Sequence, residues 1–221
     1  MSRLQRRRLK EPGWIAETSK FPVIMWEDEK NAAGGRANIN FSCFVPTNEG
    51  SVYGNCVFKV DFCLIPEFPR KSPSLAFVPA IFHSNVEESA GSICWDATGP
   101  GWVASQVLHH VVEFDLPFLL DNPNHRDPHN LEAARMAEEN DEEYKARCAL
   151  SGIQHAIRRL DTAEPREKLF EPFSAEEIAR ITKGRPYRFA EAVPLPRPHI
   201  RRREETKASK TQRSSKRRGA E

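Results

Sequence analysis

The segment IFHSNVEESAGSICWD, residues 81–96, brings a histidine, an asparagine and a cysteine together in one short stretch. Cys94 lies between a Gly-Ser pair and Trp95-Asp96, a setting typical of an extended, partly exposed segment. A cysteine becomes a nucleophile when it is accessible and partly ionised to the thiolate. The other four cysteines occupy expected strand or helix positions, where the residue usually behaves as a small apolar side chain: Cys43, Cys56, Cys63 and Cys148. Cys94 is therefore the candidate nucleophile.

His83 is the obvious candidate base for this thiol, but the sequence assigns no third group to orient it. A loop histidine more often holds backbone amides and carbonyls than carries protons. Asn85 does not titrate near neutral pH, and its useful property is a side-chain N–H that stabilises an oxyanion in acyl transfer. These groups suit a substrate already activated as a thioester, because thiolate exchange needs little help when the leaving group is also a thiol.

The number of cysteines and the length of the apolar runs limit the classes of protein to which this chain could belong. Five cysteines without C-x-x-C spacing disfavour a disulfide framework or a zinc knuckle and favour a reducing compartment. No apolar run approaches the roughly 20 residues that cross a bilayer, so we expect no membrane association. MSRLQRRRLKEPGW is basic but has no apolar core after it, so we expect a short helix or a loose basic arm rather than a secretory signal.

The net charge of +2 hides an acidic body with basic ends. Residues 1–10 hold five basic and no acidic groups, and residues 200–221 hold nine basic and three acidic groups. Residues 11–199 carry 19 basic and 28 acidic groups, a net charge of −9. We expect 200–221 to be a disordered, solvated tail. The same tail could serve as a nuclear-import signal or contact nucleic acid or an acidic protein, and the two interpretations are compatible.

The first half of the chain has the alternation of β-strands. Strands are predicted near 23–28, 37–45, 57–64 and 74–78, separated by turn-rich segments. In VFKVDFCL the apolar Phe58, Val60, Phe62 and Leu64 alternate with Lys59, Asp61 and Cys63. One face should pack on a core while the other meets solvent or a second layer. Short links between successive strands predict a four-stranded antiparallel meander.

The second half has helical periodicity. ASQVLHHVVEFDL, from near Ala104, places apolar residues on one stripe, and Pro117 should end or kink this helix. LEAARMAEE and DEEYKARCALSGIQHAIRRL predict two more helices. Strands followed by helices predict an α+β fold, with the helices packed on one face and one end of the sheet.

Three regions follow from these patterns. Residues 1–160 form the expected core, 161–199 an extension, and 200–221 the basic tail. Within the extension, Ser174 and Glu177 fit a capping box that predicts a short helix over 174–183. PLPRP after it predicts an extended, proline-rich linker.

The opening segment resembles the active-site region of the ubiquitin-conjugating enzymes. That family has histidine-proline-asparagine, then nine residues from the asparagine to a catalytic cysteine within isoleucine-cysteine-leucine-aspartate. Here His83-Ser84-Asn85 is followed by Cys94 at that spacing, inside Ile93-Cys94-Trp95-Asp96. Further matching motifs follow in the family's order: Tyr53-Gly54, the proline-rich run 65–73 (one residue short), Trp102, Pro123-Asn124, Asp127-Pro128, Asn130 and Glu142-Glu143-Tyr144.

The resemblance spans roughly residues 20 to 150 and is strongest to the histone-associated subclass. It implies that Cys94 accepts ubiquitin's C-terminal glycine as a thioester. Asn85 would order the loop and stabilise the oxyanion, and His83 would hold the loop as a structural residue. Asp127 would orient the incoming lysine and help to remove its proton. An Asx-type turn cap before the following proline is an equally open role for Asp127.

This sequence departs from the family at two positions. Ser84 replaces the family's proline, which should loosen the loop because a fixed φ angle is lost. Trp95 replaces leucine beside the nucleophile and could narrow the groove or dock ubiquitin differently. His125 and His129 fall near the expected lysine entry, where they are either solvated loop residues or groups that make discharge pH-sensitive.

The leading interpretation is an acyltransferase that carries ubiquitin on Cys94 and transfers it to a substrate lysine. No cofactor or metal of its own is expected, since the activating enzyme uses the ATP. Its implied partners are ubiquitin, the activating enzyme, a ligase of RING or another type, and a protein substrate that could be chromatin-linked. Ile65 would contact the ligase together with Ala104 and Ser105 on the facing loop, although ordinary loop packing is the alternative for all three.

Two alternatives stay open. The chain could be a weakly active or inactive variant of the same fold that binds ubiquitin or a partner, or it could conjugate a ubiquitin-like modifier. DNA binding alone is disfavoured, because the basic groups lack interleaved aromatic residues. The expected location is the cytoplasm, the nucleus or both, with the basic tail as the import signal.

Overall fold

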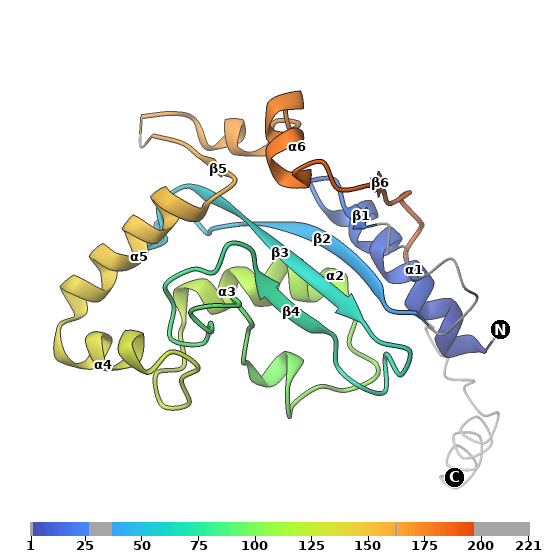
Figure 1. Cartoon of the computed structure of the whole chain (residues 1–221), viewed down its shortest axis with the longest axis horizontal. Helices are drawn as coiled ribbons and strands as arrows, with labels where there is room; N and C mark the ends of the chain where they lie inside the picture. Colours follow the sequence, from blue (N-terminus) through green and yellow to red (C-terminus); the bar gives the residue numbers. More distant parts are fainter. Residues whose placement is uncertain (1, 27–36, 162, 197–221) are drawn as a thin grey trace, which may run out of the picture.

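The computed structural model of this protein describes residues 2–26, 37–161 and 163–196 (Figure 1). At its centre lies an antiparallel sheet whose first four strands are neighbours in chain order: β1 Ile24–Trp26, β2 Ile39–Pro46, β3 Cys56–Leu64 and β4 Ser74–Phe77. The predicted meander and the α+β class are confirmed.

Two short strands enlarge this sheet beyond the prediction. β5, Arg158–Arg159, pairs antiparallel with the start of β3, and β6, Tyr187–Phe189, pairs antiparallel with β1. Segments of two and three residues are too short to show a strand's alternation. Their pairing was therefore invisible in the sequence.

The inner face of the sheet carries the main hydrophobic core. Phe41 on β2 lies opposite Phe62 on β3, and their rings stack with centroids 5.1 Å apart. The alternation predicted for β3 is confirmed on this face, where Phe58, Val60, Phe62 and Leu64 are all buried in one cluster. The outer face is also covered, because Val57 packs in a second cluster.

One long helix covers the inner face, and it differs from the prediction. It starts at Leu108 rather than near Ala104 and runs through Pro117 as α2 Leu108–His110, η3 Val111–Asp115 and α3 Leu116–Asp121. η3 is a π-helical turn in which the Leu116 N–H bonds the carbonyl of Val111, five residues back. This wider turn makes room for the proline ring, which would otherwise clash with the carbonyl four residues before it.

Helices α4, Leu131–Glu139, and α5, Asp141–His155, lie at one end of the sheet as predicted. α5 approaches the chain closely at Gly152, where an added Cβ would lie 2.4 Å from the Tyr53 carbonyl oxygen. The hydroxyl of Ser151 accepts the Phe82 N–H at 2.9 Å. α5 therefore fixes the start of the 81–96 segment.

The basic N-terminus is a helix rather than a loose arm. α1, Arg3–Thr18, begins with a capping box in which the Ser2 hydroxyl accepts the Gln5 N–H and the Gln5 side chain accepts the Ser2 N–H. Its central turn is buried although the helix is strongly polar.

Glu11 is the charged residue of this buried turn, beside the apolar Trp14 and Ile15. Its side chain is fully buried, and its two carboxylate oxygens accept the Arg7 Nε–H at 2.8 Å and the N–H of Leu108 at 3.0 Å. Leu108 is the first residue of α2, so Glu11 caps that helix from a distant part of the chain. Arg7 also donates to the carbonyls of Ala104 and Gln106. One buried ion pair thus fixes both the helix start and the loop before it.

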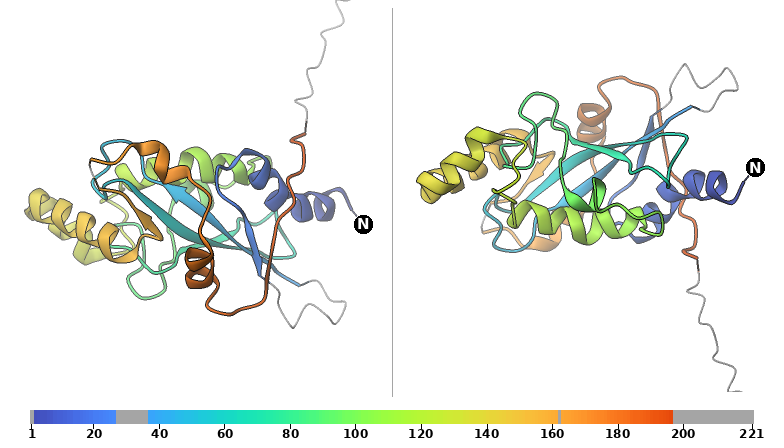
Figure 2. Two further views of the ribbon diagram at one scale, coloured as in Figure 1. Left: turned by 90° about the horizontal axis from the view of Figure 1, so that it is seen from above. Right: turned by 90° about the horizontal axis from the view of Figure 1, so that it is seen from below.

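The C-terminal extension lies on the outer face of the sheet, opposite α2 and α3 (Figures 1 and 2). It contains η4, Arg166–Phe170, and α6, Ala175–Thr182, which starts with the Ser174–Glu177 capping box. Leu169 and Ile181 pack here with residues of β1, β2 and β3. The Glu177 carboxylate receives two N–H groups from Arg158, at 2.8 and 2.9 Å.

The tail 200–221 lies outside the described residues. Of the helices in the described ranges, none is long and apolar enough to cross a bilayer.

Replacing Glu11 with alanine should lower the free energy of unfolding by about 3 kcal/mol, because it leaves the Arg7 guanidinium and the Leu108 amide without this partner. Urea denaturation followed by circular dichroism measures the change. Glu17→Ala removes an exposed carboxylate from the same helix and is the matched control, expected to change stability by less than about 0.5 kcal/mol. Equal effects of the two substitutions would contradict the assigned role of Glu11.

Candidate active site

The 81–96 segment is anchored to the edge of the sheet at β4. Isolated bridges join Ala76 to Ser92 and Val86 to Ile93. The Cys94 N–H donates to the Asn85 carbonyl at 3.0 Å, which fixes the nine-residue spacing as a closed loop. Gly91 has φ +70°, and a Cβ there would lie 2.0 Å from a backbone oxygen of β4, so this turn requires glycine.

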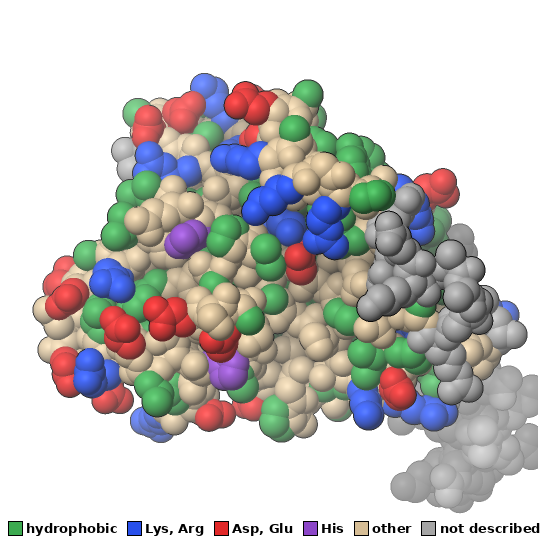
Figure 3. All heavy atoms as spheres, viewed as in Figure 1, with side chains coloured by type: hydrophobic (Ala, Val, Ile, Leu, Met, Phe, Trp, Pro, Cys, Tyr) green, Lys and Arg blue, Asp and Glu red, His purple; other side chains and the backbone are tan. Residues whose placement is uncertain are grey.

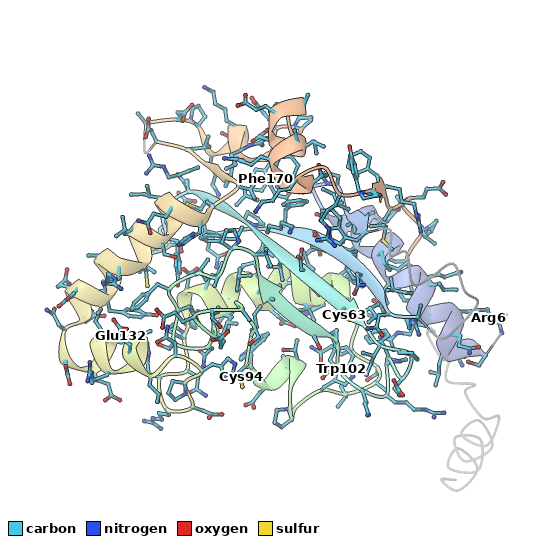
Figure 4. The ribbon with its side chains drawn as sticks, viewed as in Figure 1. Arg6, Cys63, Cys94, Trp102, Glu132 and Phe170 are labelled. Atoms are coloured by element: carbon cyan, nitrogen blue, oxygen red, sulfur yellow. The ribbon has the colours of Figure 1, made fainter. Side chains whose placement is uncertain are left out.

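Cys94 is the one exposed cysteine among the five (Figure 4). Cys43, Cys56 and Cys148 are buried and Cys63 is half-buried. Burial raises the pKa of all four, to about 11 for Cys56, because the thiolate loses its hydration there. Cys94 is therefore the most accessible thiol, which agrees with the exposure expected for its segment.

His83 is fully buried and bonded on both ring nitrogens. Nε2 lies 2.9 Å from the Leu119 carbonyl, and Nδ1 lies 2.9 Å from the Asn85 backbone nitrogen. Nδ1 must accept the Asn85 N–H, so Nε2 carries the proton and donates to the carbonyl. Burial lowers the pKa of His83 from 6.5 to about 4, which keeps the ring neutral. This geometry supports a structural role and leaves no ring nitrogen free to act as a base.

The Asn85 side chain is committed to a second loop. Its Nδ2 donates to the carbonyls of Asn124 and Asp127 at 3.0 and 3.1 Å, and its Oδ1 accepts the Asn124 N–H at 2.8 Å. The residue is 1% exposed. All the hydrogen-bonding capacity of the N–H₂ group is used by these two carbonyls. Asn85 therefore holds the turn that carries Asp127, and both of its N–H groups would have to leave that turn to reach an oxyanion.

Ser84, at the position of the family's proline, is held by hydrogen bonds of its side chain and its backbone. It is fully buried, its hydroxyl lies 2.8 Å from His125 Nδ1, and its carbonyl accepts the N–H groups of His129 and Asn130 at 2.7 and 2.8 Å. His129 also reaches the Ser92 hydroxyl through Nε2, at 3.1 Å. Hydrogen bonds to two histidines replace the fixed φ angle, so neither histidine is merely a solvated loop residue. The sequence placed both histidines near this site but gave no sign of these partners.

Asp127 lies on the exposed side of the same turn. The Asx-type bond in this turn is made by Asn124, whose Oδ1 accepts the Arg126 N–H at 3.2 Å. Asn130 caps α4 by accepting the Ala133 N–H at 3.0 Å. These two asparagines perform the capping considered for Asp127, and its carboxylate faces solvent.

The residues expected to contact a ligase lie on two joined loops. Ile65 is half-buried at the start of the 65–71 loop, while Ala104 and Ser105 are exposed on the facing loop. Trp102 joins the loops by donating from Nε1 to the Pro69 carbonyl at 2.8 Å. Arg7 fixes the carbonyl of Ala104 from behind, a support that the sequence did not reveal because the two residues are far apart in the chain.

Trp95 is half-buried beside Cys94, and its carbonyl accepts the Thr98 N–H at 3.1 Å. This bond begins η2, Asp96–Thr98, which turns the chain directly after the nucleophile. Among the described residues, no three His, Cys, Asp or Glu side chains converge in a way that could hold a metal ion. The site is thus an accessible thiol on a rigid polar loop, an arrangement that suits acyl exchange through sulfur.

Residues 18–151, more than half of the chain, match the family model described as ubiquitin-conjugating enzyme. The chain is 38% identical over 114 residues to ubiquitin-conjugating enzyme E2 5 of Arabidopsis thaliana, covering 52% of this chain and 62% of that protein. It is 35% identical over 118 residues to ubiquitin-conjugating enzyme E2-24 kDa of Saccharomyces cerevisiae, covering 53% and 52%. The chain spans about half the length of the curated relatives it matches.

A solved structure, the E2 domain of a Toxoplasma gondii ubiquitin conjugating enzyme, has the same fold. It superposes with a TM-score of 0.57 at 24% sequence identity, covering 70% of this chain and 99% of that one.

Buried, neutral His83 should make the fold sensitive to acid. The unfolded chain takes up a proton near pH 6.5, whereas the folded chain does so only near pH 4. The contribution of neutral His83 to the free energy of unfolding is therefore fully present above pH 6.5. It is lost as the pH falls toward 4, by up to about 3 kcal/mol. Urea denaturation of the wild type and His83→Gln across this range measures the difference. The exposed His129→Gln is the control, and identical slopes for all three proteins would disprove the effect.

Proposed function

Because this chain belongs to the ubiquitin-conjugating enzyme family, we propose that it carries ubiquitin as a thioester on Cys94 and transfers it to a substrate lysine. The observation that carries the proposal is the exposure of Cys94 on a loop that is fixed to Asn85 at the family's spacing. Both residues lie within the matched segment 18–151.

The reaction has two acyl-transfer steps. In the first, the Cys94 thiolate attacks the carbonyl of ubiquitin held as a thioester on the activating enzyme, and the cysteine of that enzyme leaves as a thiolate. In the second, an uncharged lysine amine attacks the new thioester. Cys94 leaves as a thiolate, an isopeptide bond forms and the amine gives up a proton. The chain needs no cofactor for these steps, since the activating enzyme uses the ATP earlier.

Asp127 is proposed to orient the lysine and to accept its proton. Its carboxylate is exposed and free of the turn capping that Asn124 and Asn130 perform. Asn85 is proposed to act first as a positioning residue, because its amide holds the Asp127 turn. A direct role of Asn85 at the oxyanion requires the amide to rotate away from this turn during discharge.

The partners and the location are proposed from the surface and the basic ends. The ligase, of RING or another type, would dock on Ile65, Ala104 and Ser105, which Trp102 and Arg7 hold on two adjoining loops. The basic tail favours nuclear import and a chromatin-linked substrate, consistent with the resemblance to the histone-associated subclass. The enzyme would then act in the nucleus, the cytoplasm or both.

A non-catalytic ubiquitin-binding protein of the same fold is the second candidate. The hydrogen bonds of the Asn85 side chain favour this candidate, because both N–H groups of its amide donate to backbone carbonyls and neither is free for an oxyanion. The exposure of Cys94 opposes it. A charging assay separates the two candidates.

Incubation with activating enzyme, ATP and ubiquitin should give an adduct that disappears with a thiol reductant. Cys94→Ala should abolish this adduct, whereas Cys63→Ala, which removes a half-buried thiol, should retain it. Non-reducing gel electrophoresis detects the product, and a parallel panel of ubiquitin-like modifiers identifies the modifier. An adduct that persists in Cys94→Ala would place the nucleophile elsewhere, and no adduct with any modifier would favour the non-catalytic candidate.

Discharge to free lysine should depend on the hydrogen bond between Ser84 and His125. Ser84→Ala and His125→Ala should each slow discharge by about tenfold, because the turn carrying Asp127 loses a restraint. The double variant should be no slower than either single variant, since both remove one bond. Ser84→Pro also removes the hydrogen bond but supplies a fixed φ angle, so its discharge rate should be close to that of the wild type.

Single-turnover discharge measures these rates, and an unchanged charging rate is the internal control. Additive effects of the two substitutions would show that Ser84 and His125 act separately.

A further inference from the structure

A cleft with a volume of about 310 Å³ lies on the outer face of the sheet, between β3, the end of α5 and α6. Figure 3 shows a group of Lys and Arg side chains on this side of the molecule, next to α6. The residues that line it come from both parts of the chain: Lys59, Asp61, Val78 and Pro79 from the region matched to the family, and 154–157, 180–183 and 185 from beyond it.

The charge in this cleft is unbalanced. Lys59 is paired with Asp61, with Nζ to Oδ1 at 3.0 Å. Arg180, Lys183 and Arg185 on the α6 side form no ion pair with any carboxylate in the described part of the chain. Three cations around a concave surface concentrate positive potential inside it. The cleft therefore favours a ligand with at least two negative charges.

Two of the three cations on the α6 side, Arg180 and Arg185, are held in place by contacts within the chain. Trp26 is buried, and its indole N–H donates to the Ser42 hydroxyl at 2.7 Å. The Arg185 guanidinium lies over this ring at 4.5 Å from its centroid, and Lys59 Nζ lies 5.3 Å from the same centroid. Arg180 donates to the Ile157 carbonyl. Fixed cations lose less conformational freedom on binding than free surface side chains do.

The opposite wall of the cleft is apolar. Val78 and Pro79 form this side, and Ile181 is a buried part of the α6 side. A ligand that fills the cleft thus meets cations on one side and hydrocarbon on the other. None of the described residues that line the cleft is Phe, Tyr or Trp, and His155 supplies one imidazole, so the cleft lacks the succession of aromatic rings on which single-stranded nucleic acid stacks.

We propose that this cleft is a docking site for an acidic peptide segment of a partner protein. Carboxylates of the segment pair with Arg180, Lys183 and Arg185, and one apolar side chain packs on Val78 and Pro79. The site depends on the packed extension, because α6 and the turn after it supply these three cations.

The docking site is separate from the nucleophile. Phe170, in the extension, and Cys94 lie on opposite sides of the sheet (Figure 4). An acidic segment bound beside α6 therefore leaves the thiol open. The site would select a partner, and its existence does not rest on the acyl transfer proposed above.

Fluorescence anisotropy with the full chain tests the site. The probe is a fluorescein-labelled twelve-residue peptide of Asp and Glu around one Leu, at physiological salt. The double variant Lys183→Glu/Arg185→Glu should weaken its binding by about tenfold or more. Arg217→Glu/Arg218→Glu, an equal change of charge in the basic tail, should weaken it by less than about twofold, because salt screens charges that make no direct contact with the probe. Equal weakening by both would overturn the site, as would no effect of the first.

Three further measurements sharpen the result. Carbodiimide, which couples carboxylates to amines, should join the probe to Lys183, and coupling confined to tail lysines would contradict the proposal. A probe with Gly in place of Leu should bind more weakly, and equal binding would rule out the apolar contact. A labelled twelve-nucleotide single strand should bind without sensitivity to the cleft variant, and tighter, cleft-dependent binding would assign the site to nucleic acid instead.

Lys183→Gln/Arg185→Gln, which removes the charges without reversing them, checks that any loss does not come from unfolding. It should give an intermediate affinity and an unchanged unfolding midpoint. Full affinity in this variant would also overturn the proposal.

Discussion

The active-site loop depends on one buried polar segment, His83-Ser84-Asn85. Each of its side chains is at most 1% exposed, and each hydrogen-bonds a part of the chain between Leu119 and Asp127. A polar group buried without a partner costs stability, so these three residues accept only one arrangement of the surrounding loops. The segment also fixes the positions of two exposed residues, Cys94 and Asp127. Cys94 is bonded through its backbone to Asn85, and Asp127 is held by the Asn85 amide.

Burial also decides which ionisable side chains remain uncharged in this protein. The four cysteines other than Cys94 are held as thiols by desolvation, and His83 is held neutral for the same reason. Of the five cysteines, Cys94 alone is exposed. The residues that hold its loop, His83, Ser84 and Asn85, lie beneath the surface and leave this sulfur accessible. The buried residues of the loop hold it in place, and its exposed residue, Cys94, remains accessible.

The sheet supports two different surfaces. Its inner face, covered by α2, η3 and α3, positions the nucleophile loop, and Glu11 fixes the start of that long helix. Its outer face is covered by the extension. Within it, the Glu177 carboxylate of α6 accepts two N–H groups from Arg158 of β5. Covering the outer face buries a second cluster of aromatic and aliphatic residues and creates the cationic cleft at its margin. The family's fold and a surface formed partly by residues beyond the matched segment are therefore built on the same strands.

The sequence alone determined the elements whose residues repeat or lie close together. Alternation predicted β2 and β3, the helical period predicted α4 and α5, and the spacing of Asn85 and Cys94 indicated the candidate reactive segment. Only the tertiary structure decided what those residues contact. The Ser84–His125 bond joins positions 41 apart and the Glu11–Leu108 cap joins positions 97 apart. Such pairs have no period and no local spacing, because packing of the whole chain brings them together, and for the same reason Pro117 could lie inside a helix that its local chemistry opposes.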